Sequence, residues 1–214
     1  MELKELKSSE IPEIRKIILE EQNFKCAICG KDITLEDRIT LDHQHKNKKS
    51  DENGPNGDGC DPESCDGVLI EGCHFDTGDD CIAIKSGRNN DGRLWAKPSE
   101  NIIIRNCKMA DGHGGVVLGS EISGGVENVF AENCEMDSPN LDRVVRIKTN
   151  PCRGGVIENI YCRNIEVGQC REAVLRINLD YERNEICCRG FNPVVRNVNL
   201  ENVTCNKSKY GVQI

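Results

Sequence analysis

Aromatic residues are scarce in this chain: Phe, Tyr and Trp make up 4% of its 214 residues, with a single tryptophan. A hydrophobic core must therefore be built from aliphatic side chains, which suit stacked β layers. No apolar run reaches the length of a transmembrane helix, and the N-terminus, Met1-Glu2-Leu3-Lys4, lacks the apolar segment of an export signal. As written, the sequence predicts a cytoplasmic protein with no membrane partner.

An excess of basic charge is also missing, because the formal net charge is −8. This balance argues against a general polyanion binder, so any site for an anion has to be local. Cysteine, in contrast, is abundant, with 14 residues, of which two form Cys26-Ala-Ile-Cys29 and twelve are spread from Cys60 to Cys205. An even number is compatible with disulfides, but without an export signal we expect buried thiols or metal ligands.

From Gly67 onward the chain repeats itself. Nine-residue phrases with a common apolar pattern begin at Gly67, Asn101, Asn128, Asn159 and Asn197. About fifteen residues after each start comes a second apolar stretch: "CIAIKSG", "GVVLGS", "VVRIKT", "AVLRINL" and "GVQI". Each repeat thus supplies at least two short strands that can stack in parallel on those of the next repeat, about 4.8 Å away.

This pattern predicts a mainly β protein, a right-handed parallel β-helix of about five coils over residues 56–214. Cysteine recurs at the seventh position of three phrases, as Cys73, Cys107 and Cys134. Small residues stack into ladders inside a solenoid, which explains most of these cysteines better than disulfides do. The segment 1–55 does not repeat, and we expect a helix followed by a small zinc-knuckle-like module there.

Polar residues far apart in sequence fall together in this register. The set is Asp58, Asp79, Asp80, His113, Arg146 and Lys148. Glycoside hydrolysis requires such a set, because one carboxylic acid protonates the leaving oxygen and a second carboxylate activates water or attacks. Crowded carboxylates do not all ionise easily, which favours a general acid at mild pH. The two cations would bind an acidic sugar.

Four blocks in this order, "NGDG", "TGDDCIAIKSG", "DGHGG" and "RIKT", resemble the signature blocks of the polygalacturonase family of glycoside hydrolases. The resemblance runs from about Asn56 to the end of the chain. It implies cleavage of α-1,4 galacturonan with inversion. It also implies that Asp79 is the general acid, supported by His113, and that Asp58 and Asp80 activate the attacking water.

The same resemblance implies how the substrate is held. Arg146 and Lys148 would grip the galacturonate carboxylate, and Tyr181 would be a further sugar contact. The family needs no metal or other cofactor, and its members are often secreted. The insertion "GRNNDGRLWAKPSE" is similar to that of exo-acting and bacterial-type members.

Two features depart from the family pattern. Gly57 stands where Thr or Ser is usual, and family members carry further coils before the first block and after "YGVQI". A solenoid needs covered ends. We therefore expect a truncated β-helix of marginal stability, with weak or absent hydrolase activity and with either aggregation or end-to-end association through the exposed last coil.

The segment before residue 55 resembles a different family. Cys26-x-x-Cys29 followed by "LDHQH" is similar to the phage endonuclease VII-like branch of the His-Asn-His nucleases. That resemblance implies a structural zinc held by Cys26 and Cys29, with Asp42 as the Mg²⁺ ligand and His43 as the base, supported by His45. The second Cys-x-x-Cys and the metal-binding Asn of that family are absent. The alternatives to a hydrolase are thus a metal-dependent DNA endonuclease and a non-catalytic chimera.

Overall fold

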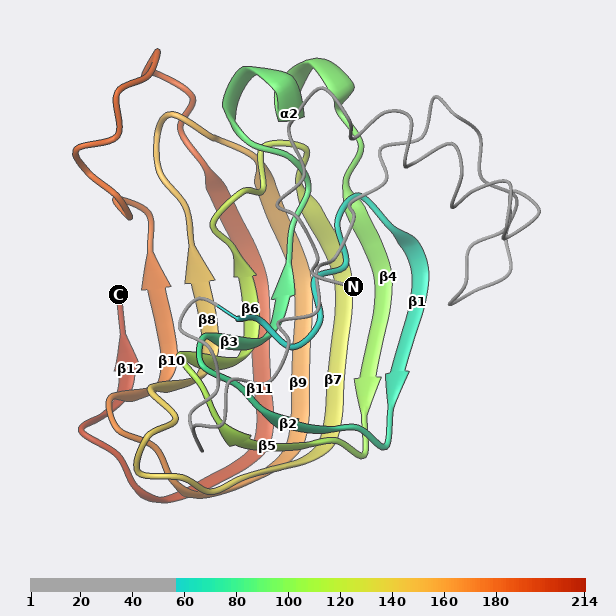
Figure 1. Ribbon diagram of the computed structural model, residues 1–214, viewed down its shortest axis with the longest axis vertical. Helices are drawn as coiled ribbons and strands as arrows, with labels where there is room; N and C mark the ends of the chain where they lie inside the picture. Colours follow the sequence, from blue (N-terminus) through green and yellow to red (C-terminus); the bar gives the residue numbers. More distant parts are fainter. Residues whose placement is uncertain (1–56) are drawn as a thin grey trace, which may run out of the picture. The chain divides into compact units, whose positions relative to one another are not determined.

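The computed structural model describes residues 57–214 (Figure 1). The chain divides into two compact units, Met1–Lys46 and Asn47–Ile214, and every described residue belongs to the second. The metal-binding residues expected for the nuclease alternative, Cys26, Cys29, Asp42 and His43, lie outside the described residues. Within 57–214 no helix is long and apolar enough to cross a membrane.

Two parallel sheets face each other (Figure 1). The seven-stranded sheet contains β1 (Asp66–Glu71), β2 (His74–Asp76), β4 (Ser99–Arg105), β5 (Lys108–Asp111), β7 (Val126–Met136), β9 (Val156–Gln169) and β11 (Val194–Lys207). The five-stranded sheet contains β3 (Asp80–Ile84), β6 (Gly114–Gly119), β8 (Arg143–Lys148), β10 (Ala173–Asn178) and β12 (Tyr210–Gln213). The chain alternates between the sheets, which makes the right-handed parallel β-helix that the repeat predicts.

The strand register confirms the alignment of the repeated phrases. Val68 pairs with Ile102, Ile102 with Val129, Val129 with Ile160, and Ile160 with Val198. These residues hold the second position of successive phrases, so the coils stack as predicted. The second apolar stretches form the five-stranded sheet, in the order β3-β6-β8-β10-β12.

Asparagine explains why the phrase is so constant. The first and sixth phrase positions have positive φ in every coil, with Asn in four coils and Gly67 and Gly72 in the first. Asn and Gly adopt this left-handed conformation at least cost. The Asn side chains also bond along the stack: Asn128 donates to Asn101 at 3.2 Å, and Asn159 donates to Asn128 at 3.1 Å. We call this row, with Asn197 donating to Asn159 at 2.6 Å, the Asn ladder.

The core between the sheets is aliphatic, as the scarcity of aromatic residues requires. Five cysteines lie buried among these side chains as thiols: Cys81, Cys107, Cys134, Cys162 and Cys170. Burial raises the pKa of the Cys162 thiol to about 12, which keeps it protonated. The expected cysteine ladder is therefore confirmed at Cys107 and Cys134, whereas Cys73 in the first described phrase is exposed.

One disulfide corrects the expectation that the cysteines are thiols or metal ligands. Cys152 and Cys187 are bonded, with their Cα atoms 5.8 Å apart and a sequence separation of 35. Cys152 lies in the loop after β8 and Cys187 in the loop after β10, and both loops are outside the stacked phrases. The repeat explains only cysteines within the coils, so it gave no information on this pair. The inserted segment after β3 contains the short helix α2 (Asn89–Trp95), which the repeat did not predict either.

Candidate active site

The site is built where the coils leave one sheet and enter β3 and β6. Asp79 immediately precedes β3, and His113 immediately precedes β6 in the next coil. The backbone N–H of His113 donates to the carbonyl of Asp79 at 2.9 Å, so the two residues are neighbours across the coils. Gly112 permits this approach: its φ is +142°, and a Cβ there would lie 2.5 Å from the carbonyl oxygen of Asp79.

Three carboxylates meet at this place. One oxygen each from Asp58, Asp79 and Asp80 lies within 4.8 Å of the other two. Asp58 is held by the backbone N–H of Asp80, which donates to its Oδ1 at 3.0 Å, and by Lys85, whose Nζ lies 3.1 Å from its Oδ2. The predicted convergence of these three residues is therefore observed.

Asp79 and Asp80 differ in environment although they are adjacent in sequence. Asp79 is partly exposed, and its Oδ1 lies 3.0 Å from Nδ1 of His113, whose side chain is half exposed. Asp80 is 1% exposed. Its pKa is raised by burial, an effect that the ammonium of Lys148 and the guanidinium of Arg146 oppose. One carboxylate thus faces solvent with a histidine beside it, and the other is enclosed by cations.

Both cations come from β8. Nζ of Lys148 donates to Oδ2 of Asp80 at 2.6 Å, and NH1 of Arg146 lies 3.6 Å from Oδ1. Ile147 between them is fully buried in the core, so the alternation along the strand turns both cations toward the carboxylates. Lys148 is 8% exposed, so its ammonium has little contact with solvent and is paired mainly with the carboxylate of Asp80.

Tyr181 joins the cluster from the loop after β10. Its ring centroid lies 5.5 Å from Cζ of Arg146 and 5.4 Å from Nζ of Lys148. A cation within about 6 Å of an aromatic face is attracted by it. All seven residues predicted for the hydrolase site are therefore gathered into one connected cluster: Asp58, Asp79, Asp80, His113, Arg146, Lys148 and Tyr181.

Sequence reasoning missed Lys85, which bridges two acidic residues. Its Nζ donates to Asp61 at 2.7 Å as well as to Asp58. Lys85 stands inside the block "TGDDCIAIKSG", directly after β3, which was a usable signal. Its partners, however, lie in the irregular segment before β1, where no repeat fixes the register.

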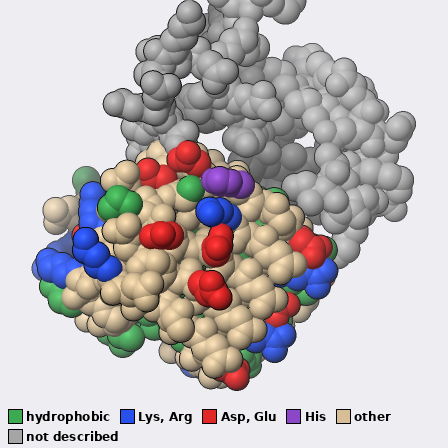
Figure 2. Space-filling model, turned by 90° about the horizontal axis from the view of Figure 1, so that it is seen from below, with side chains coloured by type: hydrophobic (Ala, Val, Ile, Leu, Met, Phe, Trp, Pro, Cys, Tyr) green, Lys and Arg blue, Asp and Glu red, His purple; other side chains and the backbone are tan. Residues whose placement is uncertain are grey.

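Figure 2 shows acidic and basic side chains interspersed over the face seen from below, without a continuous basic field.

Known proteins share both the sequence and the fold. The chain is 39% identical over 112 residues to a probable polygalacturonase of Vitis vinifera, which covers 52% of this chain and 22% of that protein. It is 30% identical over 186 residues to endopolygalacturonase A of Aspergillus niger, covering 85% of this chain and 45% of that protein. The exopolygalacturonase of Thermotoga maritima is similar in structure, with a TM-score of 0.66 and 49% identity over 71% of this chain and 33% of that one.

The chain thus spans between about a fifth and a half of the length of these relatives. The family model named Glycosyl hydrolases family 28 matches residues 1–214. That match includes the residues before 56 in which the nuclease resemblance was seen, and no comparison supports a nuclease fragment there. By this match, and by the ordered blocks that form the cluster described above, the chain belongs to glycosyl hydrolases family 28.

Proposed function

We propose that residues 56–214 contain the catalytic unit of a glycoside hydrolase that acts on galacturonan by acid–base hydrolysis. The observation that carries the proposal is the convergence of Asp58, Asp79 and Asp80 beside one histidine and two cations. Substrate-assisted and metal-dependent schemes are not needed to supply the chemistry, because three carboxylates provide both an acid and a base.

Asp79 is the general acid in this proposal. It is the carboxylate of the pair that solvent and substrate reach, and the imidazole of His113 at 3.0 Å orients it and exchanges protons with it. Asp80 and Asp58 are held instead by the cations Lys148 and Lys85, at 2.6 Å and 3.1 Å, and in this proposal they position and activate the attacking water. The environments push the carboxylates into different roles.

The stereochemical outcome is a separate part of the proposal. Inverting glycosidases usually place their two carboxyl groups about 6.5–9.5 Å apart, with the water between them. Here the closest oxygens lie within 4.8 Å. Inversion then requires that the attacking water lie beside the cluster, held by Asp58 and Asp80, and not in a gap between opposed carboxylates. Proton NMR of the first product decides this point, because inversion of an α-linkage releases the β-anomer.

Arg146 and Lys148 give the site its preference for an acidic sugar. The overall charge of −8 would repel a polyuronate, so the positive charge has to be supplied locally. Arg146 lies 3.6 Å from Asp80, farther than Lys148, and has donors left for a substrate carboxylate. We propose that Tyr181 contacts the sugar ring beside these cations.

The test is release of reducing sugar from polygalacturonate by the full chain. Asp79→Asn should lower the rate by about 10²–10⁴, the usual contribution of general acid catalysis. Asp91→Asn is a matched control, since Asp91 is exposed on α2 and has no contact with the cluster. A wild-type chain without activity on polygalacturonate, or an Asp79→Asn variant that keeps most of it, would overturn the proposal.

Exo action is our finer proposal, supported by the 49% identity to the exopolygalacturonase of Thermotoga maritima. Exo action releases a short product from chain ends while viscosity falls slowly, whereas endo action lowers viscosity at once. The endonuclease alternative, with Zn²⁺ and Mg²⁺ at Cys26, Cys29, Asp42 and His43, rests on residues outside the described part. No observation favours it, and a nicking assay on branched DNA would test it.

A further inference from the structure

Asn150 occupies a fully buried position two residues beyond Lys148, just after β8 ends. Its amide nitrogen donates one hydrogen bond to the backbone carbonyl of Tyr181 at 2.8 Å and another to Oε2 of Glu185 at 2.9 Å. Its Oδ1 accepts a third from the backbone N–H of Cys152 at 2.8 Å. Both N–H donors and the carbonyl of this buried amide are therefore used.

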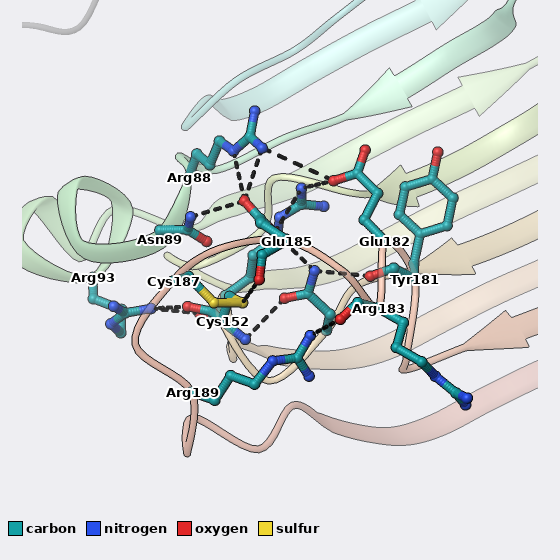
Figure 3. The surroundings of a disulfide bond; sticks show 12 residues. Arg88, Asn89, Arg93, Cys152, Tyr181, Glu182, Arg183, Glu185, Cys187 and Arg189 are labelled. Carbon is teal, nitrogen blue, oxygen red and sulfur yellow. Dashed lines mark hydrogen bonds and ion pairs between the residues drawn. A yellow bond between two sulfur atoms is a disulfide. The ribbon is translucent and has the colours of Figure 1, made fainter.

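The loop that carries Tyr181 is tied to the end of β8 at other points too. The backbone N–H of Tyr181 donates to the carbonyl of Thr149 at 3.0 Å. The disulfide joins Cys187, six residues farther along the loop, to Cys152 (Figure 3). The strand that presents both cations and the loop that presents the aromatic ring thus share one anchoring region, and Asn150 is its central hydrogen-bonding side chain.

Glu185 holds the outer side of this anchor. Arg88 and Asn89 donate to its Oε1 at 2.8 Å and 3.0 Å, as Figure 3 shows. Burial opposes ionisation of Glu185, yet the hydrogen bonds from Asn150 and Asn89 bring its pKa down to about 2. Asn150 is thus one of several donors to this charged carboxylate, and an aspartate in its position would provide none.

We propose that Asn150 is a positioning residue for substrate recognition. Through the backbone carbonyl of Tyr181 it fixes the aromatic ring at its distance of about 5.5 Å from the cations of β8. The sugar ring and its carboxylate are then received by an aromatic face and positive charges whose spacing is set before binding. This role in recognition rests on the proposed function, whereas the fixing of Tyr181 is a property of the fold alone.

A structural readout tests the fixing of Tyr181 without any substrate. The chain has three tyrosines, so 3-fluorotyrosine labelling gives three ¹⁹F signals, and Tyr181→Phe identifies the one of interest. Asn150→Ala and Asn150→Asp should shift or broaden the Tyr181 signal and leave those of Tyr161 and Tyr210 unchanged. Unchanged reference signals also show that the variant is folded.

The matched control is Asn140→Ala, which removes an exposed asparagine side chain whose Nδ2 lies 3.2 Å from Asp111. It should leave all three signals in place. A Tyr181 signal that is the same in Asn150→Ala as in the wild-type chain would overturn the proposal, whatever the activity of the protein.

A double-mutant cycle then tests the role in recognition. Asn150→Ala should raise KM for polygalacturonate about tenfold and change kcat by less than about twofold. This pattern is expected when the substrate and the transition state lose the same binding energy. In a Tyr181→Ala background it should raise KM no further, because the two residues act through one contact. Additive losses would show that Asn150 does not act through Tyr181. Absence of turnover by the wild-type chain would refute the proposed function, and the ¹⁹F comparison alone would then decide on positioning.

Discussion

At the scale of single residues, Asp80 depends most on its neighbours. Its side chain is 1% exposed, and Lys148 at 2.6 Å is its closest cation. Burial raises its pKa above the ordinary value of 3.8, and Lys148 opposes that rise. An acid with a raised pKa binds protons more tightly in the folded chain than in the unfolded chain. Its contribution to stability is therefore lost as pH rises above 3.8.

Lys148→Met keeps much of the volume of the side chain and removes its charge. The change leaves the buried carboxylate of Asp80 without its main partner, which typically costs 3–5 kcal/mol of unfolding free energy near neutral pH, so we expect a loss of roughly that size. The deficit should shrink as pH falls toward 4, because a protonated Asp80 needs no cation. Urea unfolding at several pH values measures both effects.

The double variant Asp80→Asn/Lys148→Met is the control, since it removes the charge and its partner together. It should recover much of the lost stability at neutral pH. A Lys148→Met deficit that is the same at pH 4 and pH 7 would show that packing, and not the charge of Asp80, determines the loss. The expected role of Lys148 in binding substrate stays a prediction, to be tested on polygalacturonate and its methyl ester.

Residues of the site could be predicted from the sequence where the repeat fixed their place. Asp79, His113 and Arg146 belong to blocks on successive coils, so stacking alone brings them together. Lys85 and Asn150 could not be found in this way. Their partners lie in loops, whose path depends on contacts between segments that share no period.

At the scale of the secondary-structure element, the Asn ladder stabilises each phrase in two ways. In the central coils the residue at the first position adopts a positive φ, and its amide bonds to the coils on both sides. Asn128 satisfies both demands in a central coil. The sequence shows that Asn recurs at this position in four phrases. The hydrogen bonds that it makes between coils can be recognised only in the structure.

Substitutions at Asn128 separate the two contributions. Asn128→Gly keeps the left-handed conformation and loses two hydrogen bonds, for which we expect a cost of about 1–2 kcal/mol. Asn128→Ala loses the same two hydrogen bonds, and holding alanine in the left-handed conformation adds roughly 1 kcal/mol to the loss of unfolding free energy. Denaturant unfolding of the three proteins gives the order. Equal stability of the Gly and Ala variants would mean that backbone conformation contributes nothing at this position.

At the scale of the whole molecule, the period of the sequence predicted the architecture but not its irregular parts. The five stacked coils, which contain the twelve described strands, follow from phrases spaced 27 to 38 residues apart, because a solenoid accommodates loops of such different length on a constant register. Helix α2 and the Cys152–Cys187 disulfide lie within those loops. Whether a helix or a disulfide forms there depends on local contacts within each loop. The loop sequences do not repeat, so the period gives no information about those contacts.

Solenoid stability is distributed along the stack, since each coil contacts only its neighbours. All residues of β3 and β6 are buried, whereas three of the four residues of β12 are exposed. Amide hydrogen exchange measured by mass spectrometry should therefore be slowest in β3 and β6 and fastest in β12. Uniform protection across the strands would contradict this gradient and would indicate one cooperative unit.

The Asn ladder also gives the stack a polarity. Each amide donates toward the preceding coil, and those of Asn101, Asn128 and Asn159 also accept from the following one. The row begins at the carboxylate of Asp66, which accepts from Asn101 and can only accept. Another coil could join this row only in the same orientation, head to tail, as subunits add to a polar filament. A two-fold symmetric pairing of like coil faces at the Asp66 end would set one carboxylate acceptor against another, so the hydrogen-bond direction of one side chain per coil disfavours that symmetry along the ladder.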